Sequence, residues 1–261
     1  MAHTRSLPRT RRTVDTASRF GFQWDRYRDL FAHYEPQFLA WIAPFAAEEF
    51  AGRDVLDAGC GMGRHALFAA RYGARSVLAV DRSSLAVNAA HELCASLPGV
   101  RVERRDLYDL SIKRAFDVVL AIGVLHHVEH PRLALEKLCE TLRRGGRLVA
   151  WLHAHEGNEG WVRGFRRVHP LLRLLPPRAL HALAYGISAP LFLGLPIRSE
   201  LLARASLLPF RALHASVFSQ LVPEISRYYR REEVETLFGE LELAKCEIVA
   251  RAGGWTVIAE K

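Results

Sequence analysis

Three glycines at alternate positions, Gly59, Gly61 and Gly63, stand between an apolar run and a stretch of helical spacing. Glycine has no side chain, so it lets a backbone turn sharply and approach a ligand closely. A glycine loop that ends a strand and opens a helix is where nucleotide-type ligands bind in a doubly wound sheet. The segment from Val55 to His65 therefore predicts a site for a ligand of this type.

Two residues beside the glycine loop favour one ligand of this type over another. A dinucleotide site has a third small residue at the position that Arg64 occupies, because the helix there packs closely on the strand. Asp57 precedes the loop, where its carboxylate would repel a pyrophosphate but could hold an ammonium group or a water network. Both differences argue against NAD and favour S-adenosylmethionine.

Acidic residues follow the next two predicted strands. Asp81 stands 20 residues after Gly61, where a carboxylate can accept hydrogen bonds from both hydroxyls of a ribose. Asp106 follows the third strand and could accept from an adenine amine, with Leu107 beside it as an apolar contact. The carboxyl ends of parallel strands share one edge of a sheet, so these residues and the glycine loop should lie together.

The elements that must position these residues alternate between short apolar runs and helical spacing. Strands are predicted at residues 54–58, 76–80, 100–103, 116–122 and 147–152, with helices at 63–72, 84–96 and 131–144 between them. Two helices are predicted within residues 15–50, and a helix at 231–238 with strands at 243–251 and 255–260 follows later in the chain. This alternation predicts an α/β fold with a parallel sheet covered on both faces.

The alternation of strands and helices stops after residue 153 and resumes near residue 231. The residues between are apolar, punctuated by prolines and helical in period, which predicts a helical insertion. We therefore expect four parts: a basic flexible tail at 1–14, a core at 15–153, a helical lid at 154–227 and the completion of the core at 228–261.

Composition excludes several classes of protein. Half of the 261 residues are apolar and a quarter are charged, which does not fit a disordered chain, a collagen-like repeat or a protein with many membrane spans. The four cysteines lie far apart without a CxxC pair, which favours a reducing compartment. The first 13 residues lack the apolar stretch of a secretory signal. We expect a cytoplasmic protein.

The net charge of +8 is carried by two parts of the chain. Residues 1–13 hold four arginines and no acid, and residues 151–230 hold ten arginines and four glutamates, which leaves a slightly acidic core. Within the second part, the stretch Ala179–Ile197 has no formal charge but is interrupted by prolines and glycines. We expect helices that pack on the core and line an acceptor site. A peripheral surface on anionic lipid at the inner membrane face, and a membrane span, are the alternatives.

Taken in order, these motifs resemble those of class I S-adenosylmethionine-dependent methyltransferases, in particular the small-molecule branch related to ubiquinone-biosynthesis enzymes. The resemblance covers residues 50–152 and returns more weakly at 228–261. It implies a Rossmann-like, doubly wound, seven-stranded sheet with an antiparallel last strand. It also implies contacts to S-adenosylmethionine from Asp57, Gly59, Gly61, Asp81, Arg82, Asp106, Leu107, Ala121 and Gly123.

Two histidines directly after the fourth strand are candidates for the general base that methyl transfer to a hydroxyl needs. His127 is the first choice and His126 the second. Some quinone-forming members of the family carry carboxylates in this segment, which form a metal site with the adjacent histidine. The positions from Gly123 to His127 hold no carboxylate, so we expect no metal.

Further side chains are candidates for binding the acceptor. They follow the fifth strand or are aromatic residues of the lid and its exit: His153, Glu156, Trp161 and Tyr228. Trp24 is another aromatic residue that could close over cofactor or acceptor.

The sequence therefore predicts an enzyme that transfers a methyl group from S-adenosylmethionine to oxygen of a small hydrophobic or lipid-like acceptor. An RNA methyltransferase that uses the basic tail and lid, and a non-catalytic module that binds S-adenosylmethionine, remain alternatives. The Asn-Pro-Pro-Tyr or Asp-Pro-Pro-Tyr segment of amino-methylating nucleic-acid enzymes is absent, so nucleic acid is not expected as a partner. The oligomeric state is left open.

Overall fold

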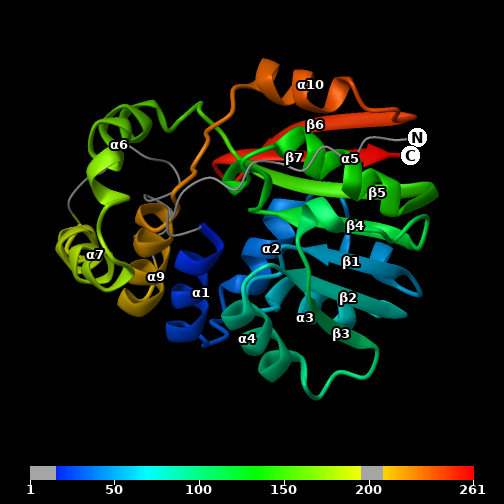
Figure 1. Cartoon of the computed structure of the whole chain (residues 1–261), viewed down its shortest axis with the longest axis horizontal. Helices are drawn as coiled ribbons and strands as arrows, with labels where there is room; N and C mark the ends of the chain where they lie inside the picture. The colour runs from blue at the N-terminus through cyan, green and yellow to red at the C-terminus, as the bar shows by residue number, and fades with distance from the viewer. Residues whose placement is uncertain (1–15, 195–207) are drawn as a thin grey trace, which may run out of the picture.

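Seven strands form one sheet in the computed structural model, which describes residues 16–194 and 208–261 (Figure 1). The strands are β1 (Asp54–Ala58), β2 (Ser76–Asp81), β3 (Val100–Arg104), β4 (Phe116–Ile122), β5 (Leu142–His153), β6 (Lys245–Arg251) and β7 (Gly254–Glu260). Their order across the sheet is β3-β2-β1-β4-β5-β7-β6. Only β7 runs antiparallel to its neighbours, β5 and β6. The predicted α/β fold with an antiparallel last strand is confirmed.

Helices cover both faces of the sheet. The helices beside it are α2 (Tyr34–Ile42), α3 (Arg64–Arg71) and α4 (Ser84–Cys94) on one face, and α5 (Pro131–Thr141) and α10 (Arg231–Gly239) on the other. Successive strand residues point to opposite faces, so Val55 packs with the first group and Leu56 with the second. Both faces are therefore buried, which explains why β4 is almost entirely apolar.

The helix α2 ends earlier than its apolar pattern indicates. It stops at Ile42, whereas the pattern predicts a helix to about Phe50. Pro44 explains this difference, because proline lacks a backbone N–H and restricts the residue before it to extended conformations. A separate short turn of 3-10 helix then spans Ala47–Phe50.

The strand β5 begins five residues before its predicted start at residue 147. Gly145 and Gly146, which lie between the predicted helix and the predicted strand, are inside β5, beside a register irregularity with β4. A Cβ on Gly146 would lie 3.1 Å from the carbonyl oxygen of Phe116, so a larger residue would push the strands apart. Glycine at a bulge is often needed for this close approach.

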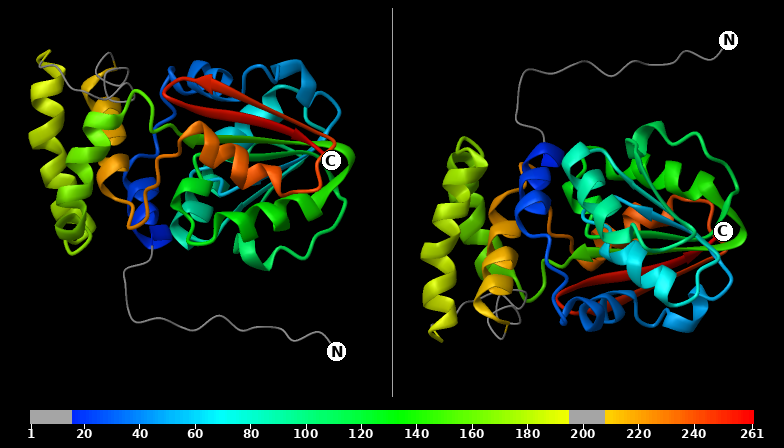
Figure 2. Two further views of the ribbon diagram at one scale, coloured as in Figure 1. Left: turned by 90° about the horizontal axis from the view of Figure 1, so that it is seen from above. Right: turned by 90° about the horizontal axis from the view of Figure 1, so that it is seen from below.

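A separate layer of helices lies beyond the carboxyl ends of the parallel strands. It contains α6 (Glu159–Leu172), α7 (Pro177–Phe192) and α9 (Phe210–Leu221). Figure 2 shows α1 (Thr16–Arg26) between this layer and the sheet. Apolar side chains such as Leu180, Leu213 and Phe218 pack inside the layer, and Tyr27 at the end of α1 joins them. The amino-terminal helix therefore connects the insertion to the core.

Parts of two predictions lie outside the described residues: the tail at 1–14, and residues 195–207 of the lid. No helix in the described part of the chain is long and apolar enough to cross a membrane.

Candidate functional site

The glycine loop after β1 has a backbone that other residues would adopt only under strain. Gly59, Gly61 and Gly63 have φ angles of +72°, +55° and +86°. A Cβ on Gly59 would lie 2.6 Å from Val124, and a Cβ on Gly61 would lie 2.9 Å from the ring of Trp24. The loop therefore needs glycine for both its turn and its close packing.

Two aspartates hold the glycine loop in place. Asp57 is fully buried beneath it, and its Oδ2 accepts the N–H of Ala66 at 3.0 Å. Burial, assisted by the nearby Asp81, raises the pKa of Asp57 to about 7. Asp81 at the end of β2 accepts the N–H of Gly61 at 3.0 Å and that of Ser83 at 2.8 Å. The carboxylates thus tie the loop to α3 and to the start of α4.

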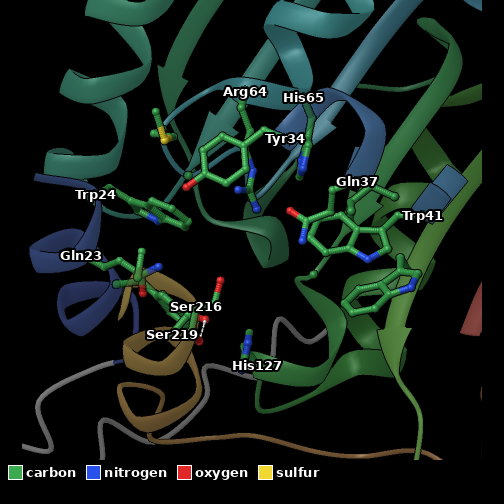
Figure 3. Close-up of a pocket in the computed structure, with 18 of the residues that line it drawn as sticks. Gln23, Trp24, Tyr34, Gln37, Trp41, Arg64, His65, His127, Ser216 and Ser219 are labelled. Atoms are coloured by element: carbon green, nitrogen blue, oxygen red, sulfur yellow. Dashed lines mark hydrogen bonds between the residues drawn. The ribbon is translucent and has the colours of Figure 1, made fainter. Parts of the chain in front are cut away.

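A cavity of about 340 Å³ opens between this loop and the helices α1, α2 and α9 (Figure 3). Its sheet side is formed by the loop residues 59–62, the end of β4 and the end of β5. The predicted site residues that line it are Gly59, Gly61, Gly123, His126, His127 and His153. One cavity thus brings the glycine loop together with both candidate bases.

Other predicted cofactor residues lie along the same sheet edge but do not line the cavity. Asp106 accepts the N–H of Tyr108 at 3.1 Å, and its carboxylate lies 3.5 Å from the guanidinium of Arg82. Leu107 is buried beside it, and Ala121 is fully buried within β4. Their cofactor roles remain predictions.

Three histidine rings pack together in the wall of the cavity, and those of His126 and His153 are stacked. The ring of His126 lies 3.9 Å from that of His153 and 4.1 Å from that of His127, centre to centre. Burial lowers the pKa of His127 to about 4 and that of His153 to about 3, and it holds the pKa of His126 well below 6.5. All three rings are therefore neutral at neutral pH.

The chain segment before α10 fixes the orientation of His127. Its Nδ1 lies 2.8 Å from the carbonyl oxygen of Ile225. A carbonyl can only accept, so Nδ1 carries the proton and Nε2 keeps a lone pair. The same segment binds the strand end through the N–H of Arg227, which donates to the carbonyl of His126.

The buried histidines predict that the protein loses stability as the pH falls. Because burial depresses the pKa of His153 from 6.5 to about 3, the unfolded chain binds more protons between these values. The unfolding free energy of the wild type should therefore fall as the pH is lowered below 6.5. In a His153→Phe variant this fall should be smaller by about 1.4 kcal/mol per pH unit. Urea denaturation at several pH values measures this.

The exposed His91 of α4 provides the control for this measurement. A His91→Gln variant should keep the pH dependence of the wild type. Equal pH dependence in the wild type and the His153→Phe variant would contradict the burial of a neutral ring at this position.

The remaining predicted acceptor residues do not line the cavity. The N–H of the Trp161 ring donates to the hydroxyl of Tyr228 at 2.9 Å, and that hydroxyl donates to Gln220, which does line the cavity, at 2.7 Å. Trp161 and Tyr228 therefore lie behind Gln220 and reach the cavity only through it. Glu156 is exposed, and its carboxylate accepts the N–H of Arg231 at 3.2 Å.

Three helices contribute cavity residues that the sequence did not identify as acceptor residues. They are Phe20 and Gln23 of α1, Tyr34, Gln37 and Trp41 of α2, and Ala215, Ser216, Ser219 and Gln220 of α9. In each set, residues recur three or four positions apart, although α9 contributes two adjacent pairs. This is the spacing of one helix face, and it was the available signal. Trp24, which the sequence did suggest, lines the cavity beside them.

Arg64 also lines the cavity, as do His65 and Trp151, and none of the three was predicted as a site residue. Arg64 served in the sequence only as an argument against a dinucleotide. Among the described residues there is no group of three or more histidine, cysteine or acidic side chains that could hold a metal ion.

Residues 55–146 match the family model described as a methyltransferase domain. A tRNA U34 carboxymethyltransferase of Marinobacter nauticus is 35% identical over 156 residues, which are 57% of this chain and 41% of the relative. The mitochondrial ubiquinone biosynthesis O-methyltransferase of Schizosaccharomyces pombe is 42% identical over 105 residues, 38% of each protein. The chain therefore spans about two fifths of the length of these relatives.

Likeness among solved structures extends over more of the chain. An O-methyltransferase family protein of Burkholderia thailandensis is 13% identical, with a TM-score of 0.60 that covers 95% of this chain and 63% of the other. This likeness concerns the fold, and it includes the helical layer as well as the sheet.

The expectation that nucleic acid is not a partner is wrong. It relied on the absence of one short segment that amino-methylating nucleic-acid enzymes use. The relative from Marinobacter nauticus, and another from Methylococcus capsulatus at 36% identity over 168 residues, are both named tRNA U34 carboxymethyltransferases. Nucleic acid therefore belongs among the candidate acceptors.

Proposed function

We propose that this chain, whose residues 55–146 form a methyltransferase domain of the class I, S-adenosylmethionine-dependent kind, methylates a hydroxyl of a small hydrophobic or lipid-like acceptor. The methyltransferase resemblance, the assignment as an enzyme and the cofactor prediction are confirmed by the domain match and the fold. The acceptor and the methylated oxygen are the proposal.

The residues at the strand ends fit this cofactor. Gly59 and Gly61 bring backbone to the cavity wall. Asp81 holds Gly61 without lining the cavity itself, and it offers a carboxylate at the neighbouring strand end for a ribose. When bound, S-adenosylmethionine supplies a methyl group on a positively charged sulfur. Asp57 tethers the loop from beneath and has no need to touch the cofactor.

The observation that carries the proposal is the position of His127 in the cavity that begins at the glycine loop. Its Nδ1–H is held by Ile225, so Nε2 can take the proton of an acceptor hydroxyl as the oxygen attacks the methyl group. The depressed pKa of His127, about 4, keeps this nitrogen unprotonated at neutral pH.

The cavity walls support an acceptor that is apolar with few polar groups. The rings of Phe20, Trp24 and Trp41 line it, and they would exclude water from the reacting atoms. Ser216 and Ser219 donate their hydroxyl protons to carbonyls of their own helix, so their oxygens can accept from an acceptor hydroxyl.

Transfer of a labelled methyl group to separated acceptor pools tests the proposal. Purified protein and labelled S-adenosylmethionine are incubated with either the organic-solvent extract or the total tRNA of a bacterial lysate. We expect label in the organic-soluble pool. Binding of the donor without transfer to either pool would contradict an enzymatic role and favour a non-catalytic binding module.

An RNA acceptor is the second candidate, because two of the relatives named above are tRNA U34 carboxymethyltransferases and the helical layer is basic. Residues 160–194 contain five arginines and no acid. Those on α6, Arg163, Arg166 and Arg167, are exposed. Charge of this kind attracts phosphate backbones.

Charge reversal on α6 tests this second candidate. If RNA binds there, Arg166→Glu with Arg167→Glu should weaken the binding of total tRNA by about tenfold and reduce its dependence on salt. Filter binding at two salt concentrations measures the effect, with Arg101→Glu on the distant strand β3 as the control. Equal tRNA binding by both variants and the wild type would contradict an RNA site on α6.

Peripheral contact with an anionic membrane is a separate proposal about location. Leu171 is 67% exposed and Leu174 75% exposed, close to the arginines of α6. Apolar side chains beside basic ones suit an anionic bilayer surface. Flotation with anionic vesicles should decrease in a Leu171→Ser, Leu174→Ser variant, and unchanged flotation would contradict the contact.

A further inference from the structure

The side chain of Gln220 is buried and forms part of the cavity wall. It lies on α9 and is only 6% exposed. A glutamine amide has an oxygen that accepts hydrogen bonds and an NH2 group that donates them. Which end of the amide meets a ligand in the cavity therefore depends on what holds the other end.

Two side chains behind Gln220 fix the direction of its amide. The ring nitrogen of Trp161 can only donate, so the hydroxyl of Tyr228 accepts its N–H at 2.9 Å. That hydroxyl then donates its own hydrogen to Oε1 of Gln220 at 2.7 Å. Burial raises the pKa of Tyr228, which keeps this hydrogen on the hydroxyl at neutral pH. Oε1 is thus occupied, and the NH2 group of Gln220 is the end left for a ligand.

The neighbouring hydroxyls on α9 present the opposite kind of group. Ser216 donates its hydrogen to the carbonyl of Ala212, and Ser219 donates its hydrogen to the carbonyl of Ser216. Their oxygens can accept from a ligand, but their hydrogens are already used. On the face of α9 that lines the cavity, the side chain that donates is therefore that of Gln220.

The face of α9 lies across the cavity from the glycine loop. In Figure 3, Ser216 and Ser219 lie on one side of the cavity, and Arg64, which directly follows the loop, lies on the other. S-adenosylmethionine bound at the loop would leave the side of α9 to the acceptor. The NH2 group of Gln220 should therefore act on the acceptor.

We propose that Gln220 determines specificity by donating a hydrogen bond to a carbonyl oxygen of the acceptor, and that Trp161 and Tyr228 position it. The inference rests on the proposed function and adds one group, a ketone, ester or amide carbonyl, to the apolar acceptor described there. A carbonyl oxygen only accepts, so it matches an amide whose own oxygen is already held. An acceptor without the carbonyl would leave the NH2 group unpaired, which disfavours its binding.

Two phenols of nearly the same shape test this pairing. 4-Hydroxypropiophenone carries a ketone, and in 4-sec-butylphenol a methyl group takes the place of the ketone oxygen. Each is titrated by calorimetry into the full chain saturated with S-adenosylhomocysteine. The ratio of the two affinities reports the hydrogen bond, because the contributions of the shared ring and hydroxyl cancel. In a Gln220→Met variant, the preference for the ketone should fall by about tenfold.

Two further variants separate the direction of the amide from its presence. Tyr228→Phe keeps Gln220 but leaves its amide free to rotate, so the preference for the ketone should fall by less than in Gln220→Met. Asn88→Leu removes an exposed amide from α4 and is the control, which should keep the wild-type ratio. Weakening of both phenols by the same factor in Gln220→Met would show a packing role and overturn the proposal.

Two other results would also overturn the proposal: the same affinity ratio in the wild type and Gln220→Met, or no binding of either phenol by the wild type. Failure of the proposed function has a different signature, because it is measured as transfer of labelled methyl groups to the lysate pools and not as binding of the phenols. If S-adenosylhomocysteine itself does not bind, the two phenols are titrated into the chain alone and the ratio decides the role of Gln220 in the same way.

Discussion

Replacing Asp81→Ala is expected to weaken binding of S-adenosylmethionine by about a hundredfold or more. The carboxylate accepts the N–H groups of Gly61 and Ser83, so its loss releases the glycine loop from the end of β2. The same carboxylate is the acceptor that we propose for the ribose hydroxyls. Both losses act on the donor site, and calorimetry measures their sum.

Two variants control this measurement. Asp81→Asn keeps one acceptor oxygen without the charge, so its affinity should lie between those of the wild type and the alanine variant. Asp109→Ala removes an exposed carboxylate from the loop after β3 and should leave affinity unchanged. A folded Asp81→Ala variant with wild-type affinity would remove Asp81 from the cofactor site.

Replacing His127→Gln is expected to lower the rate of methyl transfer by about a hundredfold to ten-thousandfold. Glutamine can still donate to the carbonyl of Ile225, but its amide has no basic nitrogen to take a proton from the acceptor. Binding of S-adenosylhomocysteine should change by less than about twofold, because we propose that His127 acts on the acceptor rather than on the donor. Labelled-methyl transfer measures the rate, and calorimetry measures the affinity for S-adenosylhomocysteine.

His130→Gln is the control, since this exposed residue precedes α5. It should transfer methyl groups at the wild-type rate. Full activity in the His127→Gln variant would contradict general-base catalysis by this residue.

The sheet side of the cavity could be predicted because its signals are local in the sequence. The glycines at 59, 61 and 63 and the acid at 81 each stand where an apolar run ends, and parallel strands bring such ends to one edge. His126 and His127 could be placed for the same reason, since they follow β4 directly. The periodicity of the apolar residues and the order of the strands were sufficient to predict this side of the cavity.

The opposite side of the cavity depends on contacts between distant parts of the chain. The faces of α1 and α9 are separated by almost two hundred positions, and nothing local specifies that they meet above the loop. From the sequence, the apolar face of either helix could equally have packed in the hydrophobic core instead of lining the cavity. Glu156 shows the opposite case. It follows β5 and was predicted to bind the acceptor, but its carboxylate accepts a hydrogen bond from the first residue of α10 instead.

The error about nucleic acid has a simpler origin. One short motif belongs to one type of nucleic-acid methylation, so its absence could not exclude the others. The five arginines of residues 160–194 were visible in the sequence and were the better signal.

A crystal structure with S-adenosylhomocysteine tests the central claim most directly, which is that one cavity joins the donor site to His127. We predict that the ligand binds in the cavity at Gly59 and Gly61, with its ribose at Asp81 and its sulfur on the side of His127. A ligand bound elsewhere, or bound with its sulfur turned away from the three histidines, would contradict it.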